Sequence, residues 1–180
     1  MSMYDDIKEI LVSEEELKEC VEKLGAQITE DYKDKNLLLV SVLRGSVIFM
    51  ADLMRQIKIP CTIDFMSVSS YGSGTKSSGV VKIVKDLDVN LAGYDILIVE
   101  DILDSGNTLS YLKKMLLTRN PSSIKICALL DKPERRTADI TADYSGLTIP
   151  DAFAVGYGLD YDEKYRNLPY IGILKRSVYS

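Results

Sequence analysis

The chain has 180 residues, 46% of them hydrophobic, and a formal net charge of -5 at pH 7. A chain of this length can bury one core and is too short for two typical domains, so we expect residues 1–180 to form a single domain. The acidic balance gives no reason to expect nucleic acid or an anionic membrane as a partner. The sequence contains no histidine, which excludes a Ser-His-Asp triad, a Cys-His pair and a histidine-based zinc site.

Three cysteines, Cys20, Cys61 and Cys127, lie far apart in the chain. Their odd number and wide spacing fit neither a disulfide framework nor clustered zinc ligands, which predicts a reducing compartment. The N-terminal sequence MSMYDDIKEI has acids where a signal peptide needs basic and then apolar residues, and no apolar run approaches the roughly 18 residues of a membrane span. We therefore expect a soluble, cytoplasmic protein.

The first predicted element is a helix that begins at a capping box. Ser13 is followed by Glu16, and apolar residues then recur at helical spacing from Leu17 to Ile28. The continuous apolar run LLLVSV at residues 37–42 is typical of a strand buried on both faces. A tight LRGS turn leads from this strand to a second helical pattern at residues 46–54.

Strands are next expected at residues 61–68 and 80–85, and between them lies the segment SSYGSGTKSSG at residues 69–79. So small and polar a segment cannot bury enough surface to stay ordered alone, and it suits a flexible lid loop. Its sequence GSGTKSS lacks the spacing of a Walker A motif and the flanking strand and helix, which disfavours ATP binding.

The second half of the chain continues the alternation. We expect a strand at 94–99, a helix from about 108 to 119, a strand at 124–130, and short strands at 153–157 and 171–174. Buried strands that alternate with helices predict an α/β fold with a mainly parallel twisted sheet flanked by helices. Since such sheets bind ligands at the carboxyl ends of their strands, the segments LRG, DKPERR and GLDYDEKYR should lie on one rim with the acidic stretch that follows residue 99.

That acidic stretch, ILIVEDILDSGNTLSYL at residues 96–112, ends in a strand-to-helix turn. A flexible Gly106, the hydroxyl groups of Ser105 and Thr108, and the backbone N–H groups at the start of a helix can together hold a phosphate. The plainer alternative is a helix whose N-cap is Asp104 or Ser105. A phosphate site and a capped helix both fit the turn taken alone.

The acids before the turn favour a more complex ligand. Glu100 and Asp101 would repel a bare phosphate, but adjacent carboxylates can accept hydrogen bonds from a vicinal diol or engage Mg²⁺. A ligand with a phosphate at one end and a ribose diol at the other satisfies both halves. A solvated strand end and a receiver-type acidic pocket are the alternatives.

The sequence VEDILDSGNTL resembles the signature for 5-phosphoribosyl 1-pyrophosphate, the phosphoribosyl donor, in the type I phosphoribosyltransferases. The segments LRGS, SSYGSGTKSSG, DKPERR and VGYGLDYDEKYRNLPYIG follow the order seen in the hypoxanthine-guanine members of that family. The resemblance implies the type I phosphoribosyltransferase fold, with a small hood formed by the N-terminal segment and residues 151–180. It also implies purine salvage, in which hypoxanthine or guanine and the donor become IMP or GMP and pyrophosphate. The alternatives are a regulatory protein of this fold that binds the donor and controls nucleic acid, and a transferase for another base such as xanthine.

The resemblance implies a role for each site residue. Asp104 would be the catalytic base that faces the imidazole nitrogen of the purine, and a chain without histidine needs a carboxylate or similar base in any case. The residues assigned to the phosphoribosyl donor are Glu100, Asp101, Ser105, Gly106, Asn107 and Thr108. The residues assigned to pyrophosphate are Arg44, Gly45 and Arg166. The residues assigned to the purine are Lys132, Phe153, Ala154 and Asp160.

Further expectations follow from the same resemblance. Mg²⁺ would be the cofactor, with Glu100, Asp101 and Asp160 as its ligands, and the lid would act through Ser70 and Tyr71. A buried Lys132 would donate to the 6-oxo group of the purine and would be left unpaired by adenine. The turn at Arg44 can contain a non-proline cis peptide in this family, and relatives form homodimers or homotetramers. Arg135 and Arg136 are interpreted as surface charges.

Overall fold

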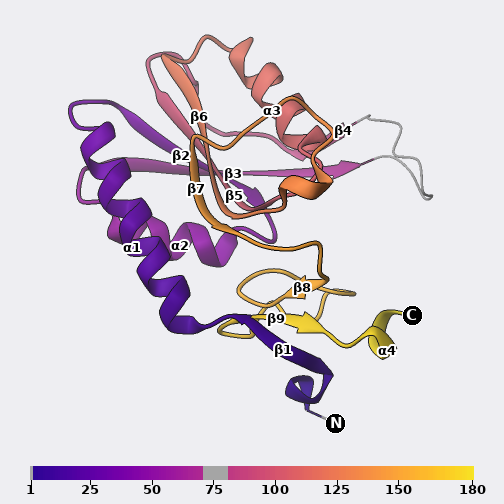
Figure 1. The fold of residues 1–180 in the computed structure, drawn as a ribbon. Coiled ribbons are helices and arrows are strands. Elements are labelled where there is room, and N and C mark those ends of the chain that lie inside the picture. Colours follow the sequence, from indigo (N-terminus) through magenta and orange to yellow (C-terminus); the bar gives the residue numbers. More distant parts are fainter. Residues whose placement is uncertain (1, 71–80) are drawn as a thin grey trace.

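Six strands form the main sheet of the protein in the computed structural model, which describes residues 2–70 and 81–180 (Figure 1). Their order is β4-β3-β2-β5-β6-β7, and all neighbours are parallel except β4, which runs antiparallel to β3. The strands are β2 (Leu37–Leu43), β3 (Cys61–Ser70), β4 (Val81–Lys85), β5 (Asp95–Leu103), β6 (Ser123–Asp131) and β7 (Tyr144–Thr148). The predicted mainly parallel α/β sheet is confirmed.

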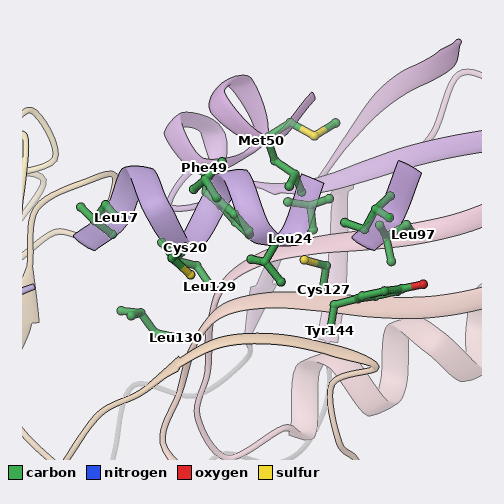
Figure 2. Packing of buried hydrophobic residues seen from close by; sticks show 14 of the residues in the cluster. Leu17, Cys20, Leu24, Phe49, Met50, Leu97, Cys127, Leu129, Leu130 and Tyr144 are labelled. Atoms are coloured by element: carbon green, nitrogen blue, oxygen red, sulfur yellow. The ribbon is translucent and has the colours of Figure 1, made fainter. Parts of the chain in front are cut away.

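Helices cover both faces of this sheet, as the continuous apolar strands predict (Figure 1). Helices α1 (Glu14–Asp31) and α2 (Val47–Gln56) pack on one face, against alternate strand residues such as Leu39 and Leu97 (Figure 2). Helix α3 (Asn107–Leu117) packs on the other face, against residues such as Leu38 and Ile98. Successive strand residues therefore belong to two cores on opposite faces.

The predicted capping box begins α1. The backbone N–H of Glu16 donates to Ser13 Oγ at 3.2 Å, and the N–H of Ser13 donates to Glu16 Oε2 at 2.8 Å. These two bonds satisfy groups that a helix terminus otherwise leaves unpaired. The sequence therefore located the start of this helix to the residue.

A second, antiparallel sheet is built from both ends of the chain and forms the expected hood (Figure 1). Its order is β1-β9-β8, in which the N-terminal strand pairs with a C-terminal one. Its strands are β1 (Ile7–Val12), β8 (Ala154–Val155) and β9 (Ile171–Leu174), and short helical turns η1 (Met3–Asp6) and α4 (Arg176–Tyr179) flank them. Strand β1 was missed because its outward residues do not alternate with buried ones.

Two predicted strand ends were too early by two residues or more. β5 continues to Leu103 rather than ending at residue 99, because its pairing with β6 extends to Leu103 opposite Asp131. Glu100 and Asp101 therefore lie within a strand, and β3 likewise runs on to Ser70. Tyr71 and the rest of the expected lid up to residue 79 lie outside the described residues. Within the part of the chain that the structure describes, no helix is long and apolar enough to cross a membrane.

Candidate active site

A cavity of about 260 Å³ opens where β2 and β5 end and α3 begins. Its lining includes the end of β2 with Gly45, residues 100–106, and the first turn of α3. The cavity thus brings together most of the residues predicted to bind the phosphoribosyl donor and to act as the base, namely Glu100, Asp101, Asp104, Ser105, Gly106 and Thr108. The rim at the carboxyl ends of parallel strands is where an α/β sheet is expected to bind its ligand.

The acid pair at the end of β5 is held in an unfavourable environment. Burial, and then the neighbouring Asp101 carboxylate, raise the pKa of Glu100 well above its usual value. Burial also raises the pKa of Asp101, although the backbone N–H of Ile102, which donates to Asp101 Oδ1 at 2.7 Å, acts in the opposite direction. Two half-buried carboxyl groups side by side favour a ligand that brings a cation or hydrogen-bond donors.

The electrostatic cost of this acid pair should lower the Tm of the ligand-free protein. We expect Glu100→Gln to raise the Tm of the ligand-free protein at neutral pH by about 2–4 °C, because a neutral amide avoids the cost of burying charge. The pKa of Glu100 is higher in the folded state than in the unfolded state. The native state therefore holds more protons, and the stability of the wild type should fall as pH rises through the range between the two pKa values.

Calorimetry from pH 5 to pH 8 can check this expectation. The exposed Glu15 on α1 supplies a matched control, since Glu15→Gln changes the same charge without touching the acid pair. Equal Tm values for wild type and Glu100→Gln over the whole range would contradict the expected penalty.

The LRGS turn packs directly against the acid pair. The peptide bond between Leu43 and Arg44 is cis, as the resemblance allowed. A Cβ atom built on Gly45 would lie 1.8 Å from Asp101 Oδ2, and one built on Gly158 would lie 2.1 Å from the carbonyl oxygen of Gly45. Any side chain at position 45 would therefore displace the Asp101 carboxylate or the turn.

The strand-to-helix turn is not closed by a side-chain cap. The N-cap of α3 is Gly106, with φ +82°, and it makes no side-chain capping bond. The alternative that Asp104 or Ser105 is the N-cap is therefore wrong. The nearest substitute is the hydroxyl of Ser105, which accepts from the N–H of Asn107 at a long 3.4 Å. The open helix start keeps the geometry of an anion site.

Asp104 has an acceptor atom without a hydrogen bond. Among the described residues, its Oδ1 is buried and accepts no hydrogen bond, although Arg135 Nε lies 3.1 Å away in an ion pair. Arg135 also lies 3.3 Å from Asp151 Oδ1. The sequence interpretation of Arg135 as a plain surface charge missed these contacts, and no local motif signals them.

The residues predicted to bind the purine lie beside the hood. Lys132 is 7% exposed, and its Nζ donates to the carbonyl of Ala152 at 2.7 Å. Phe153 is partly exposed and stacks on Tyr179, with ring centroids 4.8 Å apart, while Tyr161 meets it edge-on at 5.4 Å. Ala154 follows Phe153 on β8. Sequence reasoning missed Tyr179, since a tyrosine near the chain end carries no spacing signal.

The residues assigned to pyrophosphate gather around an acid that the sequence analysis did not single out. Glu163 Oε2 lies 2.6 Å from Arg44 Nη1 and 3.5 Å from Arg166 Nη2. Arg166 also lies 3.1 Å from Asp160 Oδ1 and donates to the carbonyl of Gly158 at 2.7 Å. Glu163 lies in the loop between β8 and β9 and thus links Arg166 of the same loop to Arg44 of the LRGS turn.

The three carboxylates predicted to hold a metal do not meet in one cluster. Asp160 is paired with Arg166, while Glu100 and Asp101 adjoin each other on β5. No group of three carboxylate, thiol or imidazole side chains within residues 2–70 and 81–180 is placed to hold a metal ion. Mg²⁺ is commonly bound by one or two carboxylates together with substrate phosphates and water, so the pair on β5 still fits such an ion.

Comparison with known proteins shows the family of the chain. A family model described as the phosphoribosyl transferase domain matches residues 7–162. The chain therefore belongs to the phosphoribosyltransferase family. It is 57% identical over 177 residues to the hypoxanthine-guanine phosphoribosyltransferase of Bacillus subtilis, covering 98% of each chain. It is 55% identical over 175 residues to the enzyme of that name from Streptococcus thermophilus, covering 97% of each.

A solved structure gives the same result for the fold. The hypoxanthine phosphoribosyltransferase of Staphylococcus aureus superposes with a TM-score of 0.97 and 53% identity, over 99% of this chain and 97% of that one. The type I phosphoribosyltransferase fold and the family resemblance of the sequence are thereby confirmed.

Proposed function

We propose that this protein is a purine salvage enzyme that converts hypoxanthine or guanine and 5-phosphoribosyl 1-pyrophosphate to IMP or GMP and pyrophosphate. The observation that carries this proposal is the cavity in which a half-buried acid pair, the Asp104 carboxylate and a helix start without a side-chain cap follow one another along residues 100–108. The names of the relatives at 55% and 57% identity support the choice of base.

The protein groups along the cavity match the chemical groups of the two substrates. The turn at residues 105–108 holds the 5′-phosphate, and Glu100 and Asp101 accept hydrogen bonds from the ribose hydroxyls. Arg44 and Arg166 neutralise the leaving pyrophosphate. As the imidazole nitrogen of the purine attacks the anomeric carbon, Asp104 Oδ1 accepts the proton of the imidazole ring. The positive charge that develops on the ribose in an oxocarbenium-like transition state is stabilised by the carboxylates beside it.

Mg²⁺ fits the acid pair as a proposed cofactor. Bound there, it would supply positive charge for the pyrophosphate and relieve the repulsion between Glu100 and Asp101. This assignment rests on the position of the two adjacent carboxyl groups in the cavity lining, since Mg²⁺ is commonly bound by one or two carboxylates together with substrate phosphates. We assign Asp160 to the orientation of Arg166 and leave a direct metal contact to the acid pair.

Lys132 is proposed to select 6-oxopurines. Its ammonium group is nearly buried, donates to the main-chain carbonyl of Ala152 and lies 3.9 Å from Asp151 Oδ1. With three N–H donors, it can donate further to an exocyclic oxygen. We expect Lys132→Ala to lower kcat/KM for hypoxanthine by about 10- to 100-fold, since hydrogen bonds to charged groups are worth roughly 1.5–3 kcal/mol. The margin against adenine should narrow by a similar factor.

Steady-state kinetics with both bases can check the role of Lys132. The exposed Lys114 on α3 provides a control variant, Lys114→Ala, with the same loss of charge. A variant at Lys132 that kept its preference for hypoxanthine over adenine would place base selection in other residues.

One assay tests the proposed function directly. The protein is incubated with the donor, Mg²⁺ and each of hypoxanthine, guanine, xanthine and adenine, and the nucleotide formed is measured. IMP and GMP are the expected products. Use of xanthine alone would favour the transferase for another base, and failure with all four would favour the regulatory alternative.

Assembly and compartment are proposals of the same kind. We expect a homodimer or homotetramer, which light scattering on the purified protein can measure. Cys20, Cys61 and Cys127 are free thiols, which is typical of a reducing compartment and supports a cytoplasmic site of action.

A further inference from the structure

Arg136 lies directly behind the phosphate-binding turn. Its side chain is only 15% exposed, although the sequence analysis interpreted it as a surface charge, which is wrong. Its Nη2 pairs with the carboxylate of Asp131 at the end of β6. Its Nη1 donates to the carbonyl of Ile140 at 2.9 Å. These two contacts anchor the guanidinium independently of the turn.

The remaining donors of this region hold the turn itself. Arg136 Nε donates to the carbonyl of Asp104 at 2.9 Å, and Arg136 Nη2 donates to the carbonyl of Leu103 at 3.3 Å. The backbone N–H groups of the next two residues, 137 and 138, both donate to the carbonyl of Ser105 at 3.0 Å. Residues 136–138 thus donate to three consecutive carbonyls, at 103, 104 and 105. The first of these also accepts from the backbone N–H of Lys132 at 3.0 Å, so the carbonyl of Asp104 depends most on Arg136.

Fixing these carbonyls also fixes the N–H groups on the other side of the same peptides. A trans peptide is planar, so its C=O and its N–H point in opposite directions. With the carbonyls of residues 103–105 turned toward residues 136–138, the N–H groups of Asp104, Ser105 and Gly106 face away from that segment. In the described part of the chain these three N–H groups donate no hydrogen bond. They are therefore free for an anion in the cavity that residues 104–106 line.

Packing supports the same arrangement. A Cβ atom built on Gly106 would lie 2.5 Å from Ile140 Cγ2 and 3.1 Å from Arg136 Cδ. The turn therefore rests on the stem of Arg136 as well as on its guanidinium. Arg136 reaches three carbonyls and one carboxylate, because arginine presents five donors in one rigid plane, whereas the ammonium group of lysine has only three donors on one atom.

We propose that Arg136 is a positioning residue that sets the orientation of the peptide groups at residues 103–105, and with them the phosphate-binding N–H groups. Arg136 is not among the residues that line the cavity, so it acts through the turn. The proposal rests on the proposed function, since it gives those N–H groups the 5′-phosphate of the donor as their ligand.

Arg136→Lys tests the proposal, because it keeps the positive charge beside Asp131 and removes the planar set of donors. We expect kcat/KM for the donor to fall on the order of 100-fold, the effect of roughly 1 Å of misplacement at a site. Most of the change should be in KM for the donor, because the 5′-phosphate is bound equally in ground and transition states. KM for the purine should change by less than about threefold on the same reasoning.

The matched control is Arg119→Lys. Arg119 also grips a carboxylate through two nitrogens, with Nη1 and Nη2 2.8 Å from the oxygens of Asp86, but it lies at the far end of α3. Hydrogen–deuterium exchange at residues 103–107 gives a readout that needs no catalysis. It should be faster in Arg136→Lys than in Arg119→Lys at equal loss of Tm. Asp131→Asn, which removes the anchor of the guanidinium, should give an intermediate change in both measurements.

Donor kinetics and exchange in Arg136→Lys that match those of Arg119→Lys would overturn the proposal. So would a loss of activity that is fully accounted for by a lower folded fraction. The exchange experiment separates this result from a failure of the proposed function: a wild type that forms no nucleotide refutes the function, whereas unchanged exchange at residues 103–107 refutes the role of Arg136.

Discussion

Asp104→Asn is expected to lower kcat by about 10²- to 10⁴-fold while the affinity for the phosphoribosyl donor stays nearly unchanged. An amide has the shape of the carboxyl group but cannot accept the imidazole proton. The donor contacts assigned to Glu100, Asp101 and the turn at 105–108 are untouched by this change. Initial rates at saturating donor and purine, together with calorimetric binding of the donor, separate the two effects.

The control for this prediction is Asp88→Asn. Asp88 is a highly exposed aspartate that follows the edge strand β4 and pairs with Lys85. Its substitution by Asn changes the net charge equally and does not touch the cavity lining. If turnover by Asp104→Asn stayed within about threefold of the control, Asp104 would have no role as the base, since such a small change lies below any general-base contribution.

Gly45→Ala is expected to lower kcat/KM for the donor on the order of 100-fold or more. The added methyl group would lie 1.8 Å from Asp101 Oδ2, which is far too close for two non-bonded atoms. Either the carboxylate or the LRGS turn must shift, and both belong to the proposed donor site. Displacements of about 1 Å at a site commonly cost that much activity. Initial-rate kinetics over a range of donor concentrations measures the loss.

Gly93→Ala controls for the general effect of adding a methyl group to a glycine. Gly93 has φ +81°, and a Cβ built on it meets nothing within 4 Å. Its substitution therefore imposes backbone strain of about 1 kcal/mol without touching the site. Full activity of Gly45→Ala at a Tm equal to that of Gly93→Ala would show that the turn and the acid pair are not coupled.

Features that depend on residues close together in the sequence were predicted, and features that depend on residues far apart in the sequence were missed. The capping box at Ser13 and the buried runs at β2 and β6 are local patterns, and the structure confirms them. The end of β5 was placed four residues too early, because acids normally end a buried strand. Here Glu100 and Asp101 stay in the strand, since β6 pairs with β5 as far as Leu103.

The contacts around the candidate site follow the same rule. The motif predicted which residues line the cavity, but not that Arg136 lies behind the turn or that Glu163 joins two arginines. These partners are 32 and 119 residues apart in the chain. Nothing in the DKPERR segment distinguishes an arginine that faces water from one that donates to three carbonyls. Only the fold places Arg136 beside Leu103 and Asp104.

The pairing order of the hood has a consequence for how the protein is made. The main sheet, with the cavity at residues 100–108, is complete once β7 has left the ribosome at Thr148. β1 is synthesised before all of it, yet its partner β9 begins only at Ile171. β8, which directly follows Phe153 of the proposed purine site, also pairs with β9. During synthesis the proposed donor half of the site can therefore form first, and the proposed purine half must wait until β9 has been made.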